Sequence, residues 1–387
     1  MGMRNSIKTF WAGAIALVLS LPYVLAAQKP QWKGKVEIEN GIKVIKNPEK
    51  PLYGEIKYEL EEDLQIGKED DDNYVFERIY DVKVDDEGNI FVLDSKAGRI
   101  QKYDKSGKYL QTIGRKGQGP GEFEMPFDMF IQLKTGSLCV RDTVRIKIFD
   151  KSGQYHKEAI LRNFPSEFAA DDDGNFWVTM NKRTEKESLK AFEKINLKGD
   201  TLLSIANFPY EIYSKRTSET SAISVITGFE HDLHFSKVDE NLFIYGYSEK
   251  YELNVVDKQG KRLFKISKDE SAQSFEAGEK KGPVGANLPS YKPFFYSIFT
   301  DDSGRIYVLK SNITAGRGKT GTPSEYDIYS KDGYFLYKTT LLYGRAFCIK
   351  NGCLYARKVL EDTGLEVIKR FKIKNWNSIK NSAEGVK

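Results

Sequence analysis

The sequence predicts an all-β fold, a six-bladed β-propeller of four-stranded antiparallel blades whose ring is closed by an N-terminal strand. Three observations lead to this prediction. The chain of 387 residues is rich in Tyr (22), Phe (23) and Gly (32), which suits many pleated strands joined by tight turns. A pair of turn patterns recurs along the chain. A segment near the N-terminus, outside these repeats, alternates apolar and polar residues and can supply the strand that the last blade lacks.

The first half of the repeat is a strand, an acidic turn with Gly or Asn, and three apolar positions. Asp and Asn tolerate turn geometry and bond to their own backbone, while Gly takes the left-handed conformation that closes a hairpin. The pattern predicts six hairpins. It occurs at 84–92, 134–140, 172–178, 239–244, 301–308 and 350–356.

The second half of the repeat is a strand that ends in an apolar or aromatic residue, followed by a second turn and another alternating strand. Two hairpins in each unit give four strands, and a four-stranded unit repeated every 40–65 residues or so is typical of a propeller blade. Five such halves are present, one fewer than the first halves. They contain the turns at 103–107, 149–153, 196–199, 256–260 and 329–333.

The missing outer strand has a candidate at the other end of the chain. The segment Tyr53–Glu62 alternates, with Ile56, Tyr58 and Leu60 on one face. We expect it to pair with the last blade and close the ring, which removes exposed strand edges. The expected organisation is a signal peptide (1–27), an N-terminal extension (28–50), the propeller (51–375) and a polar C-terminal tail (376–387).

One linker carries a family resemblance. The run from Ile113 to Phe123, with glycines at 114, 117, 119 and 121, is followed by Pro126-Phe127-Asp128 and resembles the linker between blades of the NHL-repeat family. The resemblance implies a six-bladed propeller. A WD40 propeller is disfavoured because its Gly-His and Trp-Asp pairs are absent, and a β-sandwich, which also uses many short strands, stays an alternative.

The N-terminus resembles a secretory signal peptide. Arg4 and Lys8 precede the apolar stretch Phe10–Leu21, and Pro22 comes before the small residues Ala26 and Ala27. We therefore expect an exported protein, periplasmic or extracellular, with no stable membrane span after cleavage. An uncleaved anchor is the alternative, because Phe10–Ala27 approaches the length that spans a bilayer.

Charge and cysteine content exclude several classes of function. The 60 basic and 55 acidic residues are interspersed, which gives a mixed solvated surface and no nucleic-acid footprint. The three cysteines, Cys139, Cys348 and Cys353, are too few for a disulfide framework. Cys348 and Cys353 flank a hairpin turn and are expected to lie diagonally, too far apart for an unstrained bridge.

The residue that opens each innermost strand is expected to face the central channel near its mouth, by register with the Gly turns. Converging carboxylates there would need a cation or a basic partner, so a bound Ca²⁺ in the channel is one hypothesis and a plain polar channel is the other. No other cofactor is expected. The predicted ligand-binding residues are Asp81, Asp128, Glu167, His234, Ser297 and Arg345.

Three other motifs contain residue types that can bind ligands. Gly316–Thr320 superficially resembles a phosphate loop but lacks the first glycine, since Ile313 stands there. The Gly114–Gly121 linker could offer backbone amides to an anion, but a turn-rich connection between blades is the favoured interpretation. In the segment 230–234, His231 and His234 would point to opposite faces of a strand, so a shared metal would need an irregular turn.

Long insertions distinguish the later blades and are expected to gather over one face of the ring. They are Pro209–Phe229, Lys268–Phe295 and Ser311–Ser324. The sequence favours a monomeric, non-catalytic propeller that recognises a protein, peptide or glycan through this face and the central channel. The alternative is a metal-assisted, lactonase-like hydrolase or lyase acting at the channel.

Overall fold

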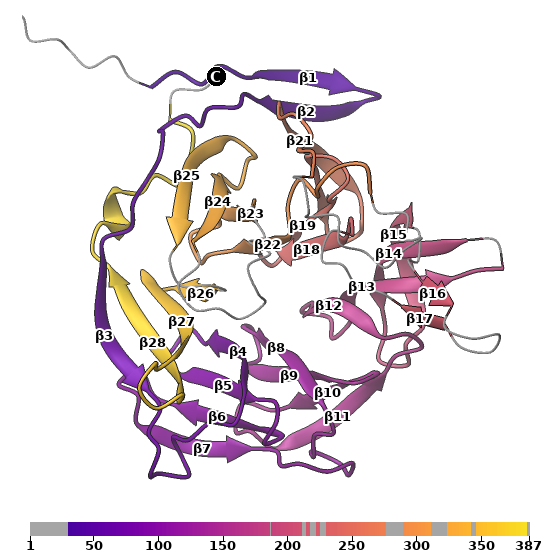
Figure 1. The fold of residues 1–387 in the computed structure, drawn as a ribbon. Helices are drawn as coiled ribbons and strands as arrows, with labels where there is room; N and C mark the ends of the chain where they lie inside the picture. Colours follow the sequence, from indigo (N-terminus) through magenta and orange to yellow (C-terminus); the bar gives the residue numbers. More distant parts are fainter. Residues whose placement is uncertain are drawn as a thin grey trace, which may run out of the picture. The chain divides into compact units, whose positions relative to one another are not determined.

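Six four-stranded antiparallel blades surround one axis in the computed structural model, as Figure 1 shows. The structure describes residues 30–185, 187–210, 214–216, 222–224, 230–275, 289–310, 323–341 and 346–384. All strands discussed below belong to the unit Gln31–Lys387. Almost all of the regular structure is strand, with one short 3-10 helix at Trp376–Ser378 in the described residues.

The first three blades run in chain order from the innermost strand to the outermost. Blade 1 contains β4 (Ile79–Val84), β5 (Ile90–Asp94), β6 (Arg99–Tyr103) and β7 (Tyr109–Ile113). Blade 2 contains β8 (Pro126–Gln132), β9 (Ser137–Asp142), β10 (Arg145–Phe149) and β11 (Tyr155–Ile160). Blade 3 contains β12 (Pro165–Ala170), β13 (Phe176–Arg183), β14 (Ser188–Ile195) and β15 (Thr201–Pro209).

The later blades keep this order, and two receive strands from outside the repeat. Blade 4 contains β18 (Leu233–Lys237), β19 (Leu242–Tyr247), β20 (Glu252–Asp257) and β21 (Arg262–Lys268). Blade 5 contains β22 (Ser297–Thr300), β23 (Ile306–Leu309), β24 (Ser324–Tyr329) and β25 (Phe335–Leu341). Blade 6 contains β26 (Ala346–Lys350), β27 (Cys353–Val359), β28 (Glu366–Ile373) and β3 (Leu60–Ile66). A separate hairpin, β16 (Ser214–Arg216) and β17 (Ala222–Ser224), lies between blades 3 and 4 in the sequence.

The acidic turns form the hairpins that the repeat predicted. In the first of them, the Asp85 carboxylate accepts hydrogen bonds from the backbone N–H groups of Glu87 and Asn89 at 3.0 and 2.8 Å. Gly88 has a φ of 86°, the left-handed conformation that a residue with a side chain rarely adopts. All six predicted first hairpins and all five predicted second hairpins are present.

The ring is closed by an N-terminal strand, as predicted, but the position of that strand needs correction. The strand that pairs antiparallel with β28 is β3 at Leu60–Ile66, whereas the predicted segment was Tyr53–Glu62. Residues 52–56 instead lie along β25 of blade 5, where the Ile56 N–H donates to the Lys338 carbonyl at 2.8 Å. The alternation in 53–62 therefore serves two neighbouring blades.

The segment before this strand forms a hairpin that extends blade 4. It consists of β1 (Lys35–Glu39) and β2 (Ile42–Asn47), and β2 pairs in parallel with the outer strand β21. The chain from β1 to β3 thus runs along the outer strands of blades 4, 5 and 6 in turn, as Figure 1 shows. We call residues 35–66 the N-terminal strap.

Aromatic side chains fill the interfaces between blades. Trp177 of blade 3 is fully buried and stacks on Phe243 of blade 4, with ring centroids 4.0 Å apart. Phe192 packs against the same cluster. Aromatic rings bury large apolar areas, so such clusters hold adjacent blades together.

The cysteines are free, in agreement with their predicted separation. Cys348 lies opposite Tyr355, and Cys353 lies opposite Lys350, on the paired strands β26 and β27. Burial raises the pKa of the Cys348 thiol to about 12, which leaves it unreactive at neutral pH.

The antiparallel order of the strands places the start of every innermost strand at one end of the ring, which we call the entry face. The segments between outer and next inner strands, and the hairpins between second and third strands, lie at this end. The described flanks of the three long insertions, such as Pro209 at the end of β15 and Leu309 at the end of β23, are at the entry face. The residues 211–213, 217–221, 225–229, 276–288 and 311–322 lie outside the described part of the chain.

Candidate functional site at the entry face

Five of the six predicted channel residues lie on innermost strands of the described blades, and their role in binding a ligand stays a prediction. Arg345 lies outside the described residues. The other five occupy one strand each, in order around the ring. They are Asp81 on β4, Asp128 on β8, Glu167 on β12, His234 on β18 and Ser297 on β22.

Asp81 joins blade 1 to blade 2. Its carboxylate accepts hydrogen bonds from Lys83 Nζ at 2.7 and 2.8 Å and from the backbone N–H of Met129 on β8 at 3.1 Å. The backbone N–H of Val82 adds a further bond at 2.9 Å. The carboxylate is therefore neutralised by a lysine on its own strand and saturated by backbone donors.

Asp128 is held by an arginine from the next strand of its own blade. Arg141 Nε donates to Asp128 Oδ1 at 2.7 Å, and Arg141 Nη1 donates to the Pro165 carbonyl of blade 3 at 2.8 Å. Burial raises the pKa of Asp128 above its ordinary value, and the nearby Asp81 raises it further, while Arg141 opposes both. Arg141 therefore links blades 2 and 3 and balances the charge of the Asp128 carboxylate.

Glu167 and His234 form the third pair, between blades 3 and 4. Glu167 Oε1 accepts from His234 Nδ1 at 3.0 Å, and Glu167 Oε2 accepts from the backbone N–H of Phe235 at 2.9 Å. Burial disfavours the charged imidazole, but the hydrogen bond and charge of Glu167 outweigh it, so the pKa of His234 lies above its usual 6.5. The pair orients the imidazole through Nδ1.

These pairings bear on the calcium hypothesis. Ca²⁺ takes six to eight oxygen ligands, usually several carboxylates that are free to turn toward it. Asp81 and Glu167 already use both oxygens for donors from the protein, and Asp128 shares one with Arg141. Among the described residues, no group of three or more His, Cys, Asp and Glu side chains could hold a metal ion. The residues present do not fit calcium.

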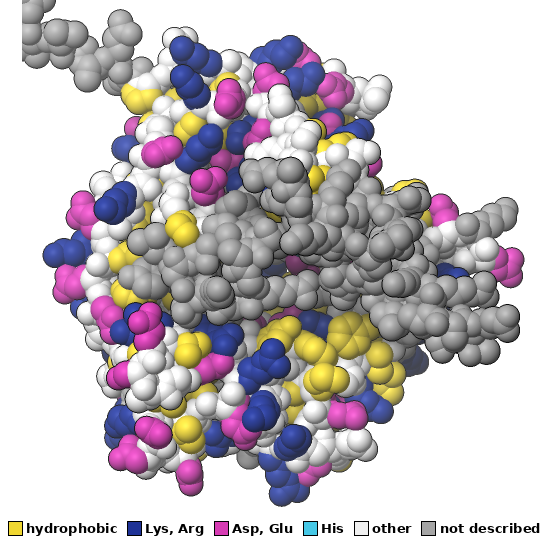
Figure 2. Space-filling model, viewed as in Figure 1, with side chains coloured by type: hydrophobic (Ala, Val, Ile, Leu, Met, Phe, Trp, Pro, Cys, Tyr) yellow, Lys and Arg dark blue, Asp and Glu magenta, His cyan; other side chains and the backbone are white. Residues whose placement is uncertain are grey.

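An apolar patch lies beside these pairs on the entry face of blades 1 to 3. Tyr80, Phe127 and Phe164 form a row, with edge-to-face ring contacts at centroid distances of 5.9 and 5.2 Å. The Arg141 guanidinium lies over both phenylalanine rings, 5.0 and 5.1 Å from their centroids. Figure 2 shows hydrophobic side chains gathered on this side of the molecule. The patch comprises Tyr80, Met125, Phe127, Val144, Ile160 and Phe164.

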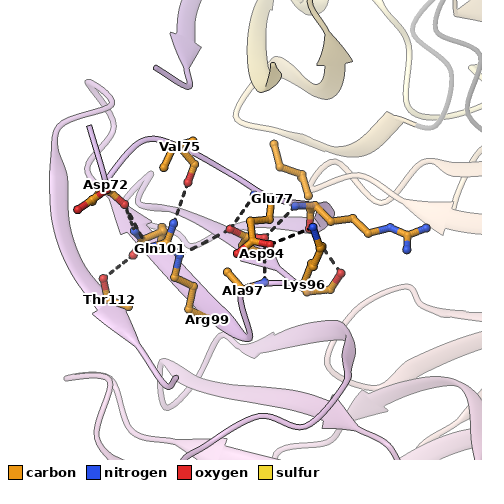
Figure 3. A network of polar contacts seen from close by, with 12 residues as sticks. Asp72, Val75, Glu77, Asp94, Lys96, Ala97, Arg99, Gln101 and Thr112 are labelled. Atoms are coloured by element: carbon orange, nitrogen blue, oxygen red, sulfur yellow. Dashed lines mark hydrogen bonds and ion pairs between the residues drawn. The ribbon is translucent and has the colours of Figure 1, made fainter. Parts of the chain in front are cut away.

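A second set of carboxylates, which the sequence did not single out, binds the backbone of the segments that lead into the inner strands. Asp94, at the end of β5, is fully buried and accepts from the backbone N–H groups of Glu77 and Arg78 at 3.1 and 2.9 Å (Figure 3). Asp142 occupies the same place at the end of β9 and binds the N–H groups of Glu124 and Met125. The recurrence of Asp at the end of a second strand, followed by Arg-Ile on the third, was the available signal.

The remaining sequence motifs are the Gly-rich linker, the pair His231 and His234, and the loop at 316–320. The carboxylate of Glu122 accepts from the Gly119 N–H at 2.9 Å, so a side chain of the protein itself lies against the amides of the Gly-rich linker. His231 contacts the Tyr291 carbonyl at 3.3 Å while His234 bonds to Glu167, so the two histidines diverge as expected. The loop at 316–320 lies outside the described residues.

Comparison with known proteins agrees with the architecture. The model of the DUF5128 family, described as a 6-bladed beta-propeller, matches residues 66–255. A solved structure of a Bacteroides fragilis protein described as exported shares 11% identity over 86% of this chain and 99% of its own, with a TM-score of 0.54. Both define the class: the protein is a six-bladed β-propeller.

Two further matches are a solved bacterial structure and a plant protein. A DUF4221 family member from Bacteroides vulgatus is 12% identical over 82% of this chain and 98% of its own, with a TM-score of 0.47. Strictosidine synthase-like 3 of Arabidopsis thaliana is 25% identical over 38% of this chain, and the matched region spans 45% of that plant protein, less than half its length. The finer NHL-repeat resemblance stays a prediction.

Within the described ranges, the structure contains no helix that is long and apolar enough to cross a bilayer. The predicted signal peptide at 1–27 precedes those ranges.

Proposed function

We propose that the protein is an exported recognition module that binds a protein, peptide or glycan at the entry face of blades 1 to 3. The apolar patch carries this proposal. Eleven large apolar side chains are markedly exposed in the described residues, and five of them lie in the patch: Tyr80, Met125, Val144, Ile160 and Phe164. Contiguous exposed apolar surface on a soluble protein usually marks a site of interaction.

Polar groups beside the patch supply the means of orienting a ligand. The side chains of Asp128 and Glu167 keep 28% and 32% of their surface accessible. Asp128 is paired with Arg141 and Glu167 with His234, so the net charge of the polar groups beside the patch is close to zero. An apolar surface bordered by a few fixed polar groups suits a ligand with both apolar and hydroxyl or amide groups.

The experiment is a ligand screen with matched variants. The purified protein is applied to a glycan array and to a phage-displayed peptide library, and hits are measured by calorimetry. We expect I160S/F164S to weaken binding at least about tenfold, because both side chains leave the patch. L202S is the control, since Leu202 is 48% exposed but lies on the outer strand of blade 3. Equal binding by both variants would remove the patch from the function.

The Glu167–His234 pair favours a second candidate, a hydrolase or lyase acting near the axis. A carboxylate that fixes one imidazole nitrogen leaves the other free to act as a general base. Among the described residues, His234 Nε2 has no hydrogen-bond partner. A panel of lactones and esters tests this candidate. Turnover by the wild type that is lost in H234A, while I160S/F164S stays active, would favour the enzyme over the recognition module.

A further inference from the structure

Within the described residues, the outer edge of the hairpin in the N-terminal strap pairs with no further strand. β1 is the outermost strand of the six-stranded sheet built on blade 4, and Figure 1 shows it at the periphery of the ring. On one face of this strand, Val36 and Ile38 expose 44% and 70% of their surface. Such an edge is a template for pairing with another strand unless the sequence opposes it.

The turn of this hairpin determines which backbone groups face outward. Asn40 and Gly41 have φ values of 50° and 79°, the two left-handed positions of a type I′ turn. The flanking pair Glu39–Ile42 therefore exchanges hydrogen bonds, and the bonded positions alternate along β1. The N–H and C=O groups of Val36 and Ile38 consequently point away from β2.

The sequence of β1 is complementary to itself when two copies run antiparallel about Glu37. In that register, Val36 lies opposite Ile38 of the second copy, and these are the residues whose backbone groups face outward. Lys35 lies opposite Glu39, which pairs opposite charges on the other face of the sheet. The two Glu37 side chains meet at the axis, where each is already neutralised by Lys35 and by Lys46 of its own copy.

We propose that two copies of the chain associate through β1, antiparallel about a twofold axis at Glu37, to form one continuous sheet. The contact is isologous, so it closes as a dimer. It involves one strand of five residues, well below the area of a stable interface, so the dimer forms reversibly with rising concentration. This replaces the monomer that the sequence predicted, and it is independent of ligand binding at the entry face.

Sedimentation velocity over about 1 to 500 µM tests the proposal. The wild type should shift from monomer to dimer within this range, and V36P and I38K should remain monomeric. Proline at 36 removes only an outward-facing donor, so the β1–β2 pairing is kept. L110K is the matched control, because Leu110 is 46% exposed on the outer strand of blade 1.

Three results would overturn the proposal. These are a wild type that stays monomeric at every concentration, a dimer that survives V36P, and a dimer that L110K disrupts as strongly as I38K. Circular dichroism of each variant checks that the propeller is folded, so that loss of the dimer reports on the edge of β1 alone.

Discussion

Glu167 on β12 and His234 on β18 are joined by a hydrogen bond of 3.0 Å between the carboxylate and imidazole Nδ1. The second oxygen of Glu167 accepts a hydrogen bond from the backbone N–H of Phe235, just as Asp81, at the interface of blades 1 and 2, accepts one from the N–H of Met129. Carboxylates on the innermost strands thus connect adjacent inner strands at two blade interfaces, between blades 1 and 2 and between blades 3 and 4. These hydrogen bonds stabilise the ring.

The Glu167–His234 pair makes stability depend on pH. The groups around the imidazole are Glu167 on β12, Asp232 just before β18 and Lys190 on β14, and the pKa of His234 is raised above 6.5 in the folded state. The stabilisation is therefore complete below pH 6.5 and is lost as the pH rises through the folded pKa. We expect H234Q to cost about 1 to 3 kcal/mol at low pH and less at high pH.

Urea unfolding of the wild type and H234Q at several pH values between about 5.5 and 8.5 measures this difference. E167Q should reverse the sign of this pH dependence, because burial then lowers the pKa of His234 without an opposing carboxylate at Glu167. A difference between wild type and H234Q that stays constant across the range would show that the pair contributes no proton linkage.

Arg141 should be the most sensitive residue of the entry face. R141M keeps the aliphatic stem against Phe127 and Phe164 but leaves the Asp128 carboxylate without its partner. We expect a loss of about 2 to 4 kcal/mol, toward the lower end because 28% of the Asp128 side chain is accessible. Chemical denaturation of R141M, D128N and D128N/R141M measures it. The double variant should be more stable than R141M, and a cost equal to the sum of the single changes would contradict the pairing.

The fold was predictable because its signals are local. Each acidic turn, such as Asp85 to Asn89, is stabilised by hydrogen bonds and a glycine within the turn itself. The hairpins can therefore be counted from the sequence. The position of Asp128 on an inner strand follows from the same register. The pairing of Asp128 with Arg141 does not follow from the register, because it depends on how β9 packs against blade 3, where Arg141 also binds the Pro165 carbonyl.

The N-terminal strap shows where sequence reasoning fails. β2 pairs in parallel with β21, more than 200 residues away, and parallel pairing leaves no turn signal between the partners. The alternation over Tyr53–Glu62 correctly indicated a strand that closes the ring, but alternation does not define register against a remote partner. The apolar patch was likewise missed, since its members come from separate loops and strands of three blades.

Asp94 should control the order of the segment that enters blade 1. It accepts hydrogen bonds from the N–H groups of Glu77 and Arg78, and Arg99 lies 3.6 Å from its carboxylate (Figure 3). D94A leaves these part-buried donors without the Asp94 carboxylate, with an expected cost of about 1 to 3 kcal/mol. Amide hydrogen exchange should accelerate at residues 77–79 beyond the change at the equivalent segment of blade 2, which Asp142 holds. Uniform acceleration across both blades would instead indicate a global loss of stability.

Asn47 should anchor the strap to blade 5. The side chain is 2% exposed; its Oδ1 accepts from the Phe335 N–H at 2.8 Å, and its Nδ2 donates to the Gly333 carbonyl at 2.9 Å. N47A removes both bonds and leaves two buried backbone groups without partners, so we expect a loss of about 2 to 4 kcal/mol in unfolding free energy. N207A, at an exposed site on β15, should change stability by less than about 0.5 kcal/mol. If both variants unfold at the same urea concentration, the part of the strap around Asn47 contributes little to stability, and the closing of the ring depends on its last strand, β3.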